Sequence, residues 1–442
     1  MKKNLSNTVE FHPVSAPDFL PPPQLRDLQF QRLRAIVQRA YDRQALFRQR
    51  MEERKLAPAD LKSLADLAKL PFTVKTDLRD TYPFGLFASP MEEIVRLHAS
   101  SGTTGKPIVV AYTAADVEVW TNAMVRSFAC CGVHAGDVIQ NAYGYGLFTG
   151  GLGAHYGAEK LGATVIPISG GNTQRQLMVM KDFGVTVICC TPSYFLHLLD
   201  QAAELGINLK DLPLRAGIFG AEPWTENMRR RIESESGIQA FDIYGLSEIV
   251  GPGVAMECQC QSGPHIFEDY FYPEIVDPKT GKVLGDEEEG ELVLTTLAKF
   301  AMPMIRYRTR DITALTSEQC KCGRHLRRIK RISRRSDDMF IIRGINVYPS
   351  QIEAALLAVE GTLPHYQIIL TRERGLDEME VQVEVTADFF SDTVGALEKL
   401  QSNLSRSIET TAGLRAKVRL VQPRTLQRSE GKAKRVIDQR KM

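Results

Sequence analysis

The sequence predicts an α/β protein with a large N-terminal domain built from βα units and a small C-terminal α+β domain. The 442 residues are 43% hydrophobic and 24% charged, a balance typical of a globular protein with a substantial core. A single core rarely grows beyond roughly 250 to 300 residues, so we expect more than one domain. Short apolar runs alternate with helical stretches between residues 109 and 297, which indicates a mostly parallel sheet.

Individual elements follow from local patterns. Residues 25–53 carry apolar side chains at spacings of three and four between charged ones, which predicts one amphipathic helix. The prolines at 21–23 end any element before it. The runs ATVIPI, VTVICC and AGIFG predict buried strands. A basic cluster then marks a boundary near Asp337, which predicts a large domain at 1–336 and a small one at 337–442. The small domain should contain a strand (MFIIRG), a helix from Ser350 and the alternating strand EVQVEVTA.

Charge and cysteine usage exclude several classes of protein. Fifty-five Lys and Arg against fifty-three Asp and Glu leave a net charge of +2, which argues against nucleic-acid or anionic-membrane binding. The sequence contains no secretory signal and no run of roughly 20 apolar residues that could span a bilayer. The eight cysteines form four close pairs, a pattern unlike a disulfide scaffold. We therefore expect a cytoplasmic protein.

A loop rich in glycine and hydroxyl groups is the first chemical motif. The string HASSGTTGKP at residues 98–107 contains Ser100, Ser101, Gly102, Thr103, Thr104, Gly105 and Lys106. Glycines let backbone N–H groups approach an anion, hydroxyls add donors and the lysine adds positive charge, so the loop suits phosphate binding. It lacks the order of a Walker A loop. A plain surface loop is the alternative on composition alone.

This string resembles the phosphate loop of the adenylate-forming superfamily of acyl-CoA synthetases, luciferases and peptide-synthetase adenylation domains, and five further motifs follow in that family's order. The resemblance implies that Gly220, Ala221, Glu222 and Pro223 pass beneath the adenine and that Asp242 meets its amino group, and it places Tyr244, Gly245 and Ser247 in a nucleotide-binding signature. It implies a magnesium ligand at Glu248 and a ribose contact at Asp311. Arg335 and Asp337 resemble the hinge before a mobile lid, and Lys432 resembles the catalytic lysine, with Lys434 as its competitor.

The chemistry of adenylation calls for these residue types. In-line attack of a carboxylate on the α-phosphate concentrates negative charge, which a metal ion and fixed cations must stabilise. Glu248 offers the hard oxygen ligand that Mg²⁺ prefers. Lys432 is a point charge on a flexible stem, so closure of the lid could bring it to the reacting groups. Taken singly, each residue could equally be a solvated surface group.

Within the superfamily the sequence is similar to the phenylacetate:CoA ligase family. The similarity lies in runs such as NAYGYGLFTGGLGAHYGAEKLGATVIPISGGNTQRQ, IYGLSEIVGPGVAMEC and RSDDMFIIRGINVYPSQIE. It implies that ATP and Mg²⁺ activate phenylacetate or a related aryl acid, that coenzyme A accepts the acyl group, and that the protein is a homodimer.

A segment of aromatic residues and glycines supports an aryl substrate. Residues 141–153, NAYGYGLFTGGLG, predict a flat pocket built by Tyr143, Tyr145, Phe148, Gly150 and Gly151, in which aromatic edges meet a ring. An ordinary packed turn has the same composition. The family resemblance favours the pocket.

Two clusters of soft ligands suggest zinc. MECQCQSGPHIFE carries Cys258, Cys260 and His265, and EQCKCGRH carries Cys320, Cys322 and His325. Such ligands in a cytoplasmic protein suit a structural zinc ion, although free thiols are the alternative. The resemblance favours Cys258, His265, Cys320 and Cys322. The remaining cysteines lie in apolar runs and are expected in the core.

Two other functions fit part of this pattern. An adenylating enzyme of the same family could deliver its acyl group to a carrier protein, an amine or another acceptor. A non-enzymatic nucleotide-binding protein is disfavoured because Glu248, Asp311 and Lys432 are all present.

Overall fold

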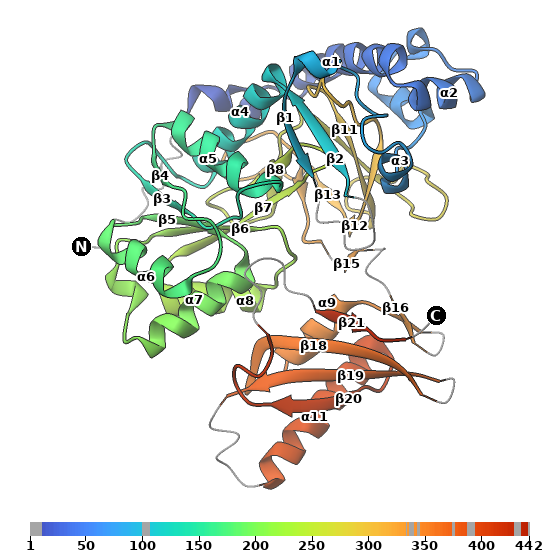
Figure 1. The fold of residues 1–442 in the computed structure, drawn as a ribbon. Coiled ribbons are helices and arrows are strands. Elements are labelled where there is room, and N and C mark those ends of the chain that lie inside the picture. Colours follow the sequence, from blue (N-terminus) through green and yellow to red (C-terminus); the bar gives the residue numbers. More distant parts are fainter. Residues whose placement is uncertain are drawn as a thin grey trace.

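The computed structural model describes residues 11–99, 107–332, 334–335, 340–342, 345–373, 376–386, 394–427 and 435–440. The predicted phosphate loop, Ser100 to Lys106, lies outside the described residues, as do the hinge residue Asp337 and Lys432 with its competitor Lys434. Figure 1 shows a large part, blue to yellow, above a smaller orange and red part. In the described parts of the chain, no helix is both long and apolar enough to cross a bilayer.

A nine-stranded sheet forms the centre of the large part, in the order β13-β14-β9-β8-β7-β6-β5-β3-β4. Its parallel half comprises β3 (Val138–Asn141), β4 (Thr164–Ile166), β5 (Val187–Cys190), β6 (Ala216–Gly220) and β7 (Gln239–Leu246). The helices that connect these strands are α5 (Thr149–Leu161), α6 (Thr173–Asp182), α7 (Pro192–Glu204) and α8 (Glu226–Ser236), with the short η5 (Leu209–Asp211). The βα prediction and the three predicted strands are therefore confirmed.

The other half of this sheet is antiparallel, which the sequence analysis did not foresee. It comprises β8 (Gly251–Glu257), β9 (Pro264–Ile266), β13 (Leu315–Thr316) and β14 (Arg328–Ile329). A second, antiparallel sheet of four strands contains β10 (Phe271–Val276), β11 (Gly290–Thr296), β12 (Tyr307–Thr313) and β15 (Arg334–Arg335). A hairpin of β1 (Ile94–Ala99) and β2 (Val109–Thr113) precedes α4 (Ala114–Cys130).

The N-terminal helix differs from its prediction. Instead of one helix at 25–53, the chain forms α1 (Pro22–Arg43) and α2 (Ala45–Glu53). Gln44 is extended between them, and its Nε2 donates to the carbonyls of Leu86 (2.6 Å) and Pro303 (3.0 Å). These distant acceptors explain the break, because periodicity alone cannot reveal them. The shorter elements of this region are η1 (Pro13–Phe19), η2 (Pro58–Asp60), η3 (Leu64–Lys69), α3 (Lys75–Asp80) and η4 (Met91–Glu93).

The small C-terminal part has its own sheet and core. Its strands are ordered β20-β19-β18-β21, with bounds Lys417–Val421, Leu376–Val385, Thr362–Glu373 and Val436–Asp438. Its other elements are β16 (Phe340–Ile342), β17 (Ile345–Val347), α9 (Pro349–Leu357) and α11 (Val394–Ala412). The predicted α+β character, the strand MFIIRG and the helix near Ser350 are confirmed. A buried cluster that includes Ile368, Val381 and Leu404 is drawn entirely from this part. The exact boundary at 336/337 stays a prediction.

Candidate functional site

The predicted adenine segment begins where β6 ends. Parallel strands of an open α/β sheet commonly bind ligands beyond their carboxyl ends, and Gly220 to Pro223 lie at such an end. A Cβ on Gly220 would lie 2.4 Å from the carbonyl oxygen of Ile243, so the close approach of β7 requires glycine. Ala221 has a φ of +70°, a strained value for a residue with a side chain. Glu222 accepts from the N–H of Ser193 at the start of α7 (2.7 Å).

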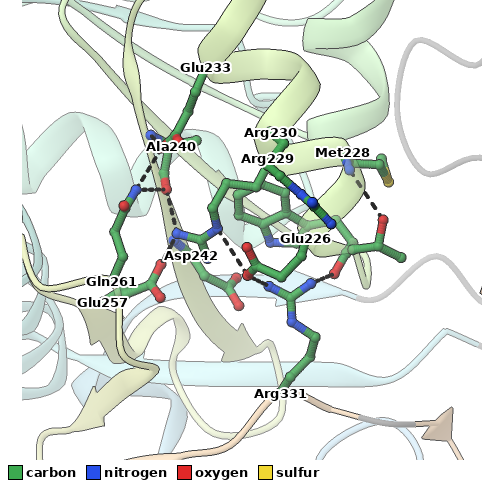
Figure 2. A network of polar contacts seen from close by, with 12 residues as sticks. Glu226, Met228, Arg229, Arg230, Glu233, Ala240, Asp242, Glu257, Gln261 and Arg331 are labelled. Carbon is green, nitrogen blue, oxygen red and sulfur yellow. Dashed lines mark hydrogen bonds and ion pairs between the residues drawn. The ribbon is translucent and has the colours of Figure 1, made fainter.

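Asp242 lies on the neighbouring strand β7, backed by a polar network (Figure 2). Its N–H donates to Oε2 of Glu257 (3.0 Å), and that same oxygen accepts from Nη1 of Arg229 (2.9 Å). Burial and the nearby negative charge of Glu257 raise the pKa of Asp242 to about 6, against the opposing effects of Trp224, Arg229 and Arg331. With a pKa of about 6 the side chain is ionised at neutral pH, a state that suits an acceptor for a ligand donor.

Tyr244 and Asp311 meet although they come from different sheets. The Tyr244 hydroxyl on β7 donates to Oδ2 of Asp311 on β12 (2.6 Å). Asp311 is paired in register with Arg335 of β15, whose side chain is outside the described part of the structure. Gly245 is required next to Tyr244, because a Cβ there would lie 2.0 Å from the carbonyl oxygen of Gly251. Tyr244, a predicted nucleotide-binding residue, thus holds the predicted ribose residue Asp311 in a defined orientation.

Glu248 lies buried on the turn that follows β7. Its Oε1 is 4.0 Å from Nζ of Lys75, at the start of α3, and its main-chain carbonyl accepts from Nζ of Lys299 (3.1 Å). The neighbouring Ser247 hydroxyl lies 3.1 Å from that of Thr149, which connects this turn with the start of α5. A buried carboxylate flanked by cations fits the role of a hard ligand for Mg²⁺.

The sequence analysis missed both lysines. Lys75 follows a strand-like run and gives no signal of its own. Lys299 does give one, because it is the single charged residue between Glu291 and Arg306. A lone charge in so apolar a run marks a side chain that is either paired in the interior or functional.

The predicted aryl residues form a tight loop between β3 and α5. Tyr143 is buried and donates to the carbonyl of Ile218 (3.2 Å). The Tyr145 hydroxyl accepts from Nδ2 of Asn141 (2.8 Å) and lies 3.2 Å from Nδ1 of His155. The glycines permit this packing. A Cβ added to Gly150 would lie 3.4 Å from the Tyr143 side chain, and one added to Gly151 would lie 2.6 Å from the carbonyl oxygen of Gly144. Phe148, in contrast, is half exposed at the N-cap position of α5.

Four of the predicted soft ligands come together. The side chains of Cys258, His265, Cys320 and Cys322 are buried, and their ligand atoms all lie within 4.8 Å of one another. The Sγ atoms of Cys258 and Cys320 are 3.6 Å apart, and Sγ of Cys322 is 3.4 Å from Nε2 of His265. Three thiols and one imidazole, from two segments about sixty residues apart, thus meet around one centre, and the donor set matches tetrahedral zinc.

Electrostatics and exposure favour this same set. A hydrogen bond with Cys258 lowers the pKa of the Cys322 thiol, and a second hydrogen bond, with His265, lowers it further. The bond between the two thiols raises the pKa of Cys258. The group therefore favours a thiolate, which is the form that binds metal. Cys260 and His325 are exposed, and the His325 ring bonds the carbonyl of Leu20 (3.0 Å). Cys130, Cys131, Cys189 and Cys190 are buried, as predicted.

Comparison with known proteins identifies both parts of the chain. Residues 32–299 match the family described as AMP-binding enzyme, and residues 344–440 match the AMP-binding enzyme C-terminal domain. The phenylacetate-coenzyme A ligase of Pseudomonas putida is 54% identical over 417 residues, which cover 94% of this chain and 94% of that protein.

Solved structures of an acyl-CoA ligase resemble this chain over nearly its whole length. A 2-hydroxyisobutyryl-CoA ligase in the postadenylation state with 2-HIB-AMP superposes with a TM-score of 0.90 at 30% identity, covering 98% of this chain and 94% of its own. The same ligase with 2-HIB-AMP and CoA in the thioesterification state gives 0.73 at 31% identity, covering 100% and 97%. The two domains of this chain are therefore arranged more like the postadenylation state.

Proposed function

We propose that this chain, which belongs to the phenylacetate-coenzyme A ligase family of AMP-binding enzymes, activates phenylacetate or a closely related aryl acid with ATP and transfers the acyl group to coenzyme A. The observation that carries the proposal is the convergence of Asp242, Tyr244, Glu248 and Asp311 around the end of β7. The 54% identity to a ligase with that name supports the substrate.

Each residue of the nucleotide site has a distinct task in this proposal. The Asp242 carboxylate accepts from the adenine amino group, and Gly220 to Pro223 lie beneath the ring. Asp311 accepts from the ribose hydroxyls, with its orientation fixed by Tyr244. Ser100 to Lys106 and Arg335 complete the site by family resemblance. These fixed partners place the α-phosphate beside the acid, which lowers the entropic cost of their reaction.

Glu248 is the residue that would hold Mg²⁺, which neutralises phosphate charge when bound. Lys75 would be a second cation at the same carboxylate. Lys432, on the lid, would approach the reacting carboxylate and α-phosphate in the adenylation arrangement. Lys432→Ala should then abolish formation of the aryl-adenylate while leaving thioester formation from preformed adenylate largely intact, as single-turnover assays of each half reaction would reveal. Equal loss in both half reactions would contradict this role.

The aryl acid would lie against the loop of Tyr143, Tyr145, Phe148, Gly150 and Gly151. Buried Tyr143 offers a ring edge, and the two glycines bring backbone close to it. Tyr143, Phe148 and the two glycines would give this wall the flat surface that suits a phenyl ring.

The second half reaction requires the lid to move. We place the pivot at Asp337, between the two domains at 1–336 and 337–442. The related 2-hydroxyisobutyryl-CoA ligase has been solved in both the postadenylation and the thioesterification state, which supports a movement of the lid in this chain as well. Rotation would remove Lys432 and open a path for the thiol of coenzyme A.

A structural Zn²⁺ held by Cys258, His265, Cys320 and Cys322 is also part of the proposal. Four protein ligands leave no open position for substrate, so such an ion would hold the two loops together rather than act in catalysis. We further propose a homodimer in the cytoplasm, which sedimentation of the purified protein and fractionation of cells would test.

The decisive test of function is a screen of aryl and aliphatic acids for AMP release in the presence of ATP and Mg²⁺. We expect release with phenylacetate or a close relative, dependent on free coenzyme A, and loss of that release in Glu248→Gln. Lys282→Gln, at a partly exposed residue between β10 and β11, is the matched control and should retain full activity. AMP release that requires a carrier protein or an amine instead would establish the alternative acceptor.

A further inference from the structure

Lys299 is a buried cation beside the proposed magnesium ligand. It lies on the connection between β11 and β12, and the residue is 2% exposed. Its Nζ donates to the main-chain carbonyl of Glu248 (3.1 Å) and lies 5.1 Å from the centre of the Tyr112 ring. The ammonium group is therefore held between a carbonyl and an aromatic face, a geometry in which a cation–π interaction is favourable.

The backbone that follows Lys299 is anchored. The Asp116 carboxylate, in the first turn of α4, accepts from the N–H groups of Phe300 and Ala301. Nε of Arg39 donates to the carbonyl of Phe300 (2.8 Å). These contacts fix the direction of the Lys299 side chain before any ligand binds.

Lys299 belongs to a row of three donors along the segment that begins with Glu248. The Tyr112 hydroxyl donates to the carbonyl of Val250 (3.0 Å), and Nε1 of Trp120 donates to the carbonyl of Pro252 (2.9 Å). The two rings are stacked, with centroids 5.1 Å apart. The carbonyls of residues 248, 250 and 252 are thus held in succession, and Lys299 binds the first, that of Glu248 itself.

The same rings contact the strand that leads into the predicted phosphate loop. The ring of His98, two residues before Ser100, lies edge-on to Tyr112 and Trp120 with centroids 5.6 and 5.7 Å away. The cluster therefore connects the end of β1 with the Glu248 turn, two segments that must approach the same triphosphate.

A stability role alone does not account for a lysine here. The Lys299 residue is almost fully buried, so its ammonium group has given up most of its contact with water. A buried charge commonly stabilises a fold less than an apolar side chain of similar volume. The energetic cost is explained if the lysine holds Glu248 in position.

We infer that Lys299 is a positioning residue that holds the Glu248 turn, through its main-chain carbonyl, in the orientation that Mg·ATP requires. This inference deepens the proposed function and depends on the proposed role of Glu248. It concerns binding rather than the chemical step, so calorimetry can test it without an assay of activity.

The test is titration of ATP into the full-length protein with and without Mg²⁺. For the wild type we expect Mg²⁺ to increase ATP affinity. Lys299→Met should reduce this increase roughly tenfold, the scale of one charge-assisted hydrogen bond, and leave the magnesium-free affinity unchanged. Lys299→Arg, which keeps the charge, should restore part of the increase. Lys330→Met, at a surface lysine paired with Glu287, is the control and should behave as wild type.

A double mutant separates positioning from general structural damage. If Lys299 acts through Glu248, adding Lys299→Met to Glu248→Gln should change the magnesium effect little further. If Lys299→Met does not fold, Tyr112→Phe can replace it, because it removes the neighbouring donor to the carbonyl of Val250. This variant should show a smaller reduction of the magnesium-dependent increase in ATP affinity.

Three results would overturn the inference. Mg²⁺ could fail to increase the ATP affinity of the wild type, the increase could be unchanged in Lys299→Met (or in Tyr112→Phe if Lys299→Met does not fold), or the losses could be additive in the double mutant. A wild type that binds Mg·ATP as expected yet activates no acid would refute the proposed function and leave this inference standing.

Discussion

Two buried charge networks in the large domain show how similar residues serve different purposes. In the first, both oxygens of Asp18 accept from arginines: Arg126 binds Oδ1 (Nε, 2.9 Å) and Arg324 binds Oδ2 (Nε, 3.0 Å). Asp269 adds a second carboxylate 2.8 Å from Nη2 of Arg126. Each of these four side chains is at most 1% exposed.

The second network lies behind the proposed adenine site. Nη1 of Arg229 donates to Glu257 and to the carbonyl of Ala240, and the backbone N–H of Asp242 donates to the same oxygen of Glu257 (Figure 2). Burial, and next the negative charge of Glu257, raise the pKa of Asp242, whereas Asp18 and Asp269 raise the pKa of Arg126 despite its burial. The comparison teaches that a carboxylate enclosed by arginines maintains the fold, while one left beside a competing carboxylate is available to a ligand.

The largest effect should come from opening the Asp18 network. Asp18→Asn leaves Arg126 and Arg324 buried without their shared counter-charge, so unfolding free energy should fall by about 3 to 5 kcal/mol. Denaturant titration measures this loss, and the remaining folded protein should keep its ATP affinity. Glu118→Gln, which breaks a surface pair with Lys160, is the control and should change stability little. A stability of Asp18→Asn close to wild type would contradict the structural role.

The next largest effect concerns the cysteine–histidine cluster. This cluster lies close in sequence to the Asp18 network, because the N–H of His325, three residues after Cys322, donates to the carbonyl of Asp18 in η1 (2.9 Å). Cys322→Ser should remove bound zinc and lower the thermal midpoint by several degrees, because metal binding contributes to folding. Cys260→Ser, at an exposed cysteine of the same segment, should retain both. Metal analysis with thermal denaturation provides the measurement; a metal-free native protein of full stability would end the zinc proposal.

A smaller effect tests the proposed nucleotide site. Tyr244→Phe removes the hydroxyl that orients Asp311, so KM for ATP should rise about tenfold, with kcat and stability nearly unchanged. Tyr41→Phe, which removes a surface hydrogen bond to Glu52, should leave KM unchanged. Steady-state kinetics at saturating acid measures both. A loss of stability in Tyr244→Phe would place this pair with the structural network instead.

The last prediction is a pH dependence. Because the pKa of Asp242 is about 6 in the folded protein and 3.8 ordinarily, folding is penalised once this group ionises. Asp242→Asn should therefore stabilise the ligand-free protein fully above pH about 6, with the gain vanishing as pH falls toward about 4. In the wild type, KM for ATP should rise below pH 6 as the acceptor is protonated, and the variant should lose that inflection. A parallel change in KM for the acid would point to another group.

The sequence predicted elements whose signals are local. The strands at AGIFG and VTVICC are apolar runs, and the four metal-ligand candidates lie in two short segments that the structure brings together. Asp242 and Asp311 could be assigned tasks because their motifs resemble a known family. Lys432 and Asp337 were assigned in the same way and stay predictions.

Other features depend on contacts between distant segments. The break at Gln44 is explained by carbonyls of residues 86 and 303. The bond from Tyr244 to Asp311 joins strands of two sheets, and Lys299 reaches Glu248 across 51 residues. Periodicity and composition contain no information on such pairings, so the arrangement of the site required the folded structure.

Exchange of radiolabelled pyrophosphate into ATP tests the central claim most directly. With Mg²⁺, phenylacetate and no coenzyme A, we expect rapid exchange by the wild type, because adenylation is reversible at the site around Glu248. If the folded protein exchanges no pyrophosphate with phenylacetate or any other acid of a broad panel, it does not form acyl-adenylates and the account is wrong.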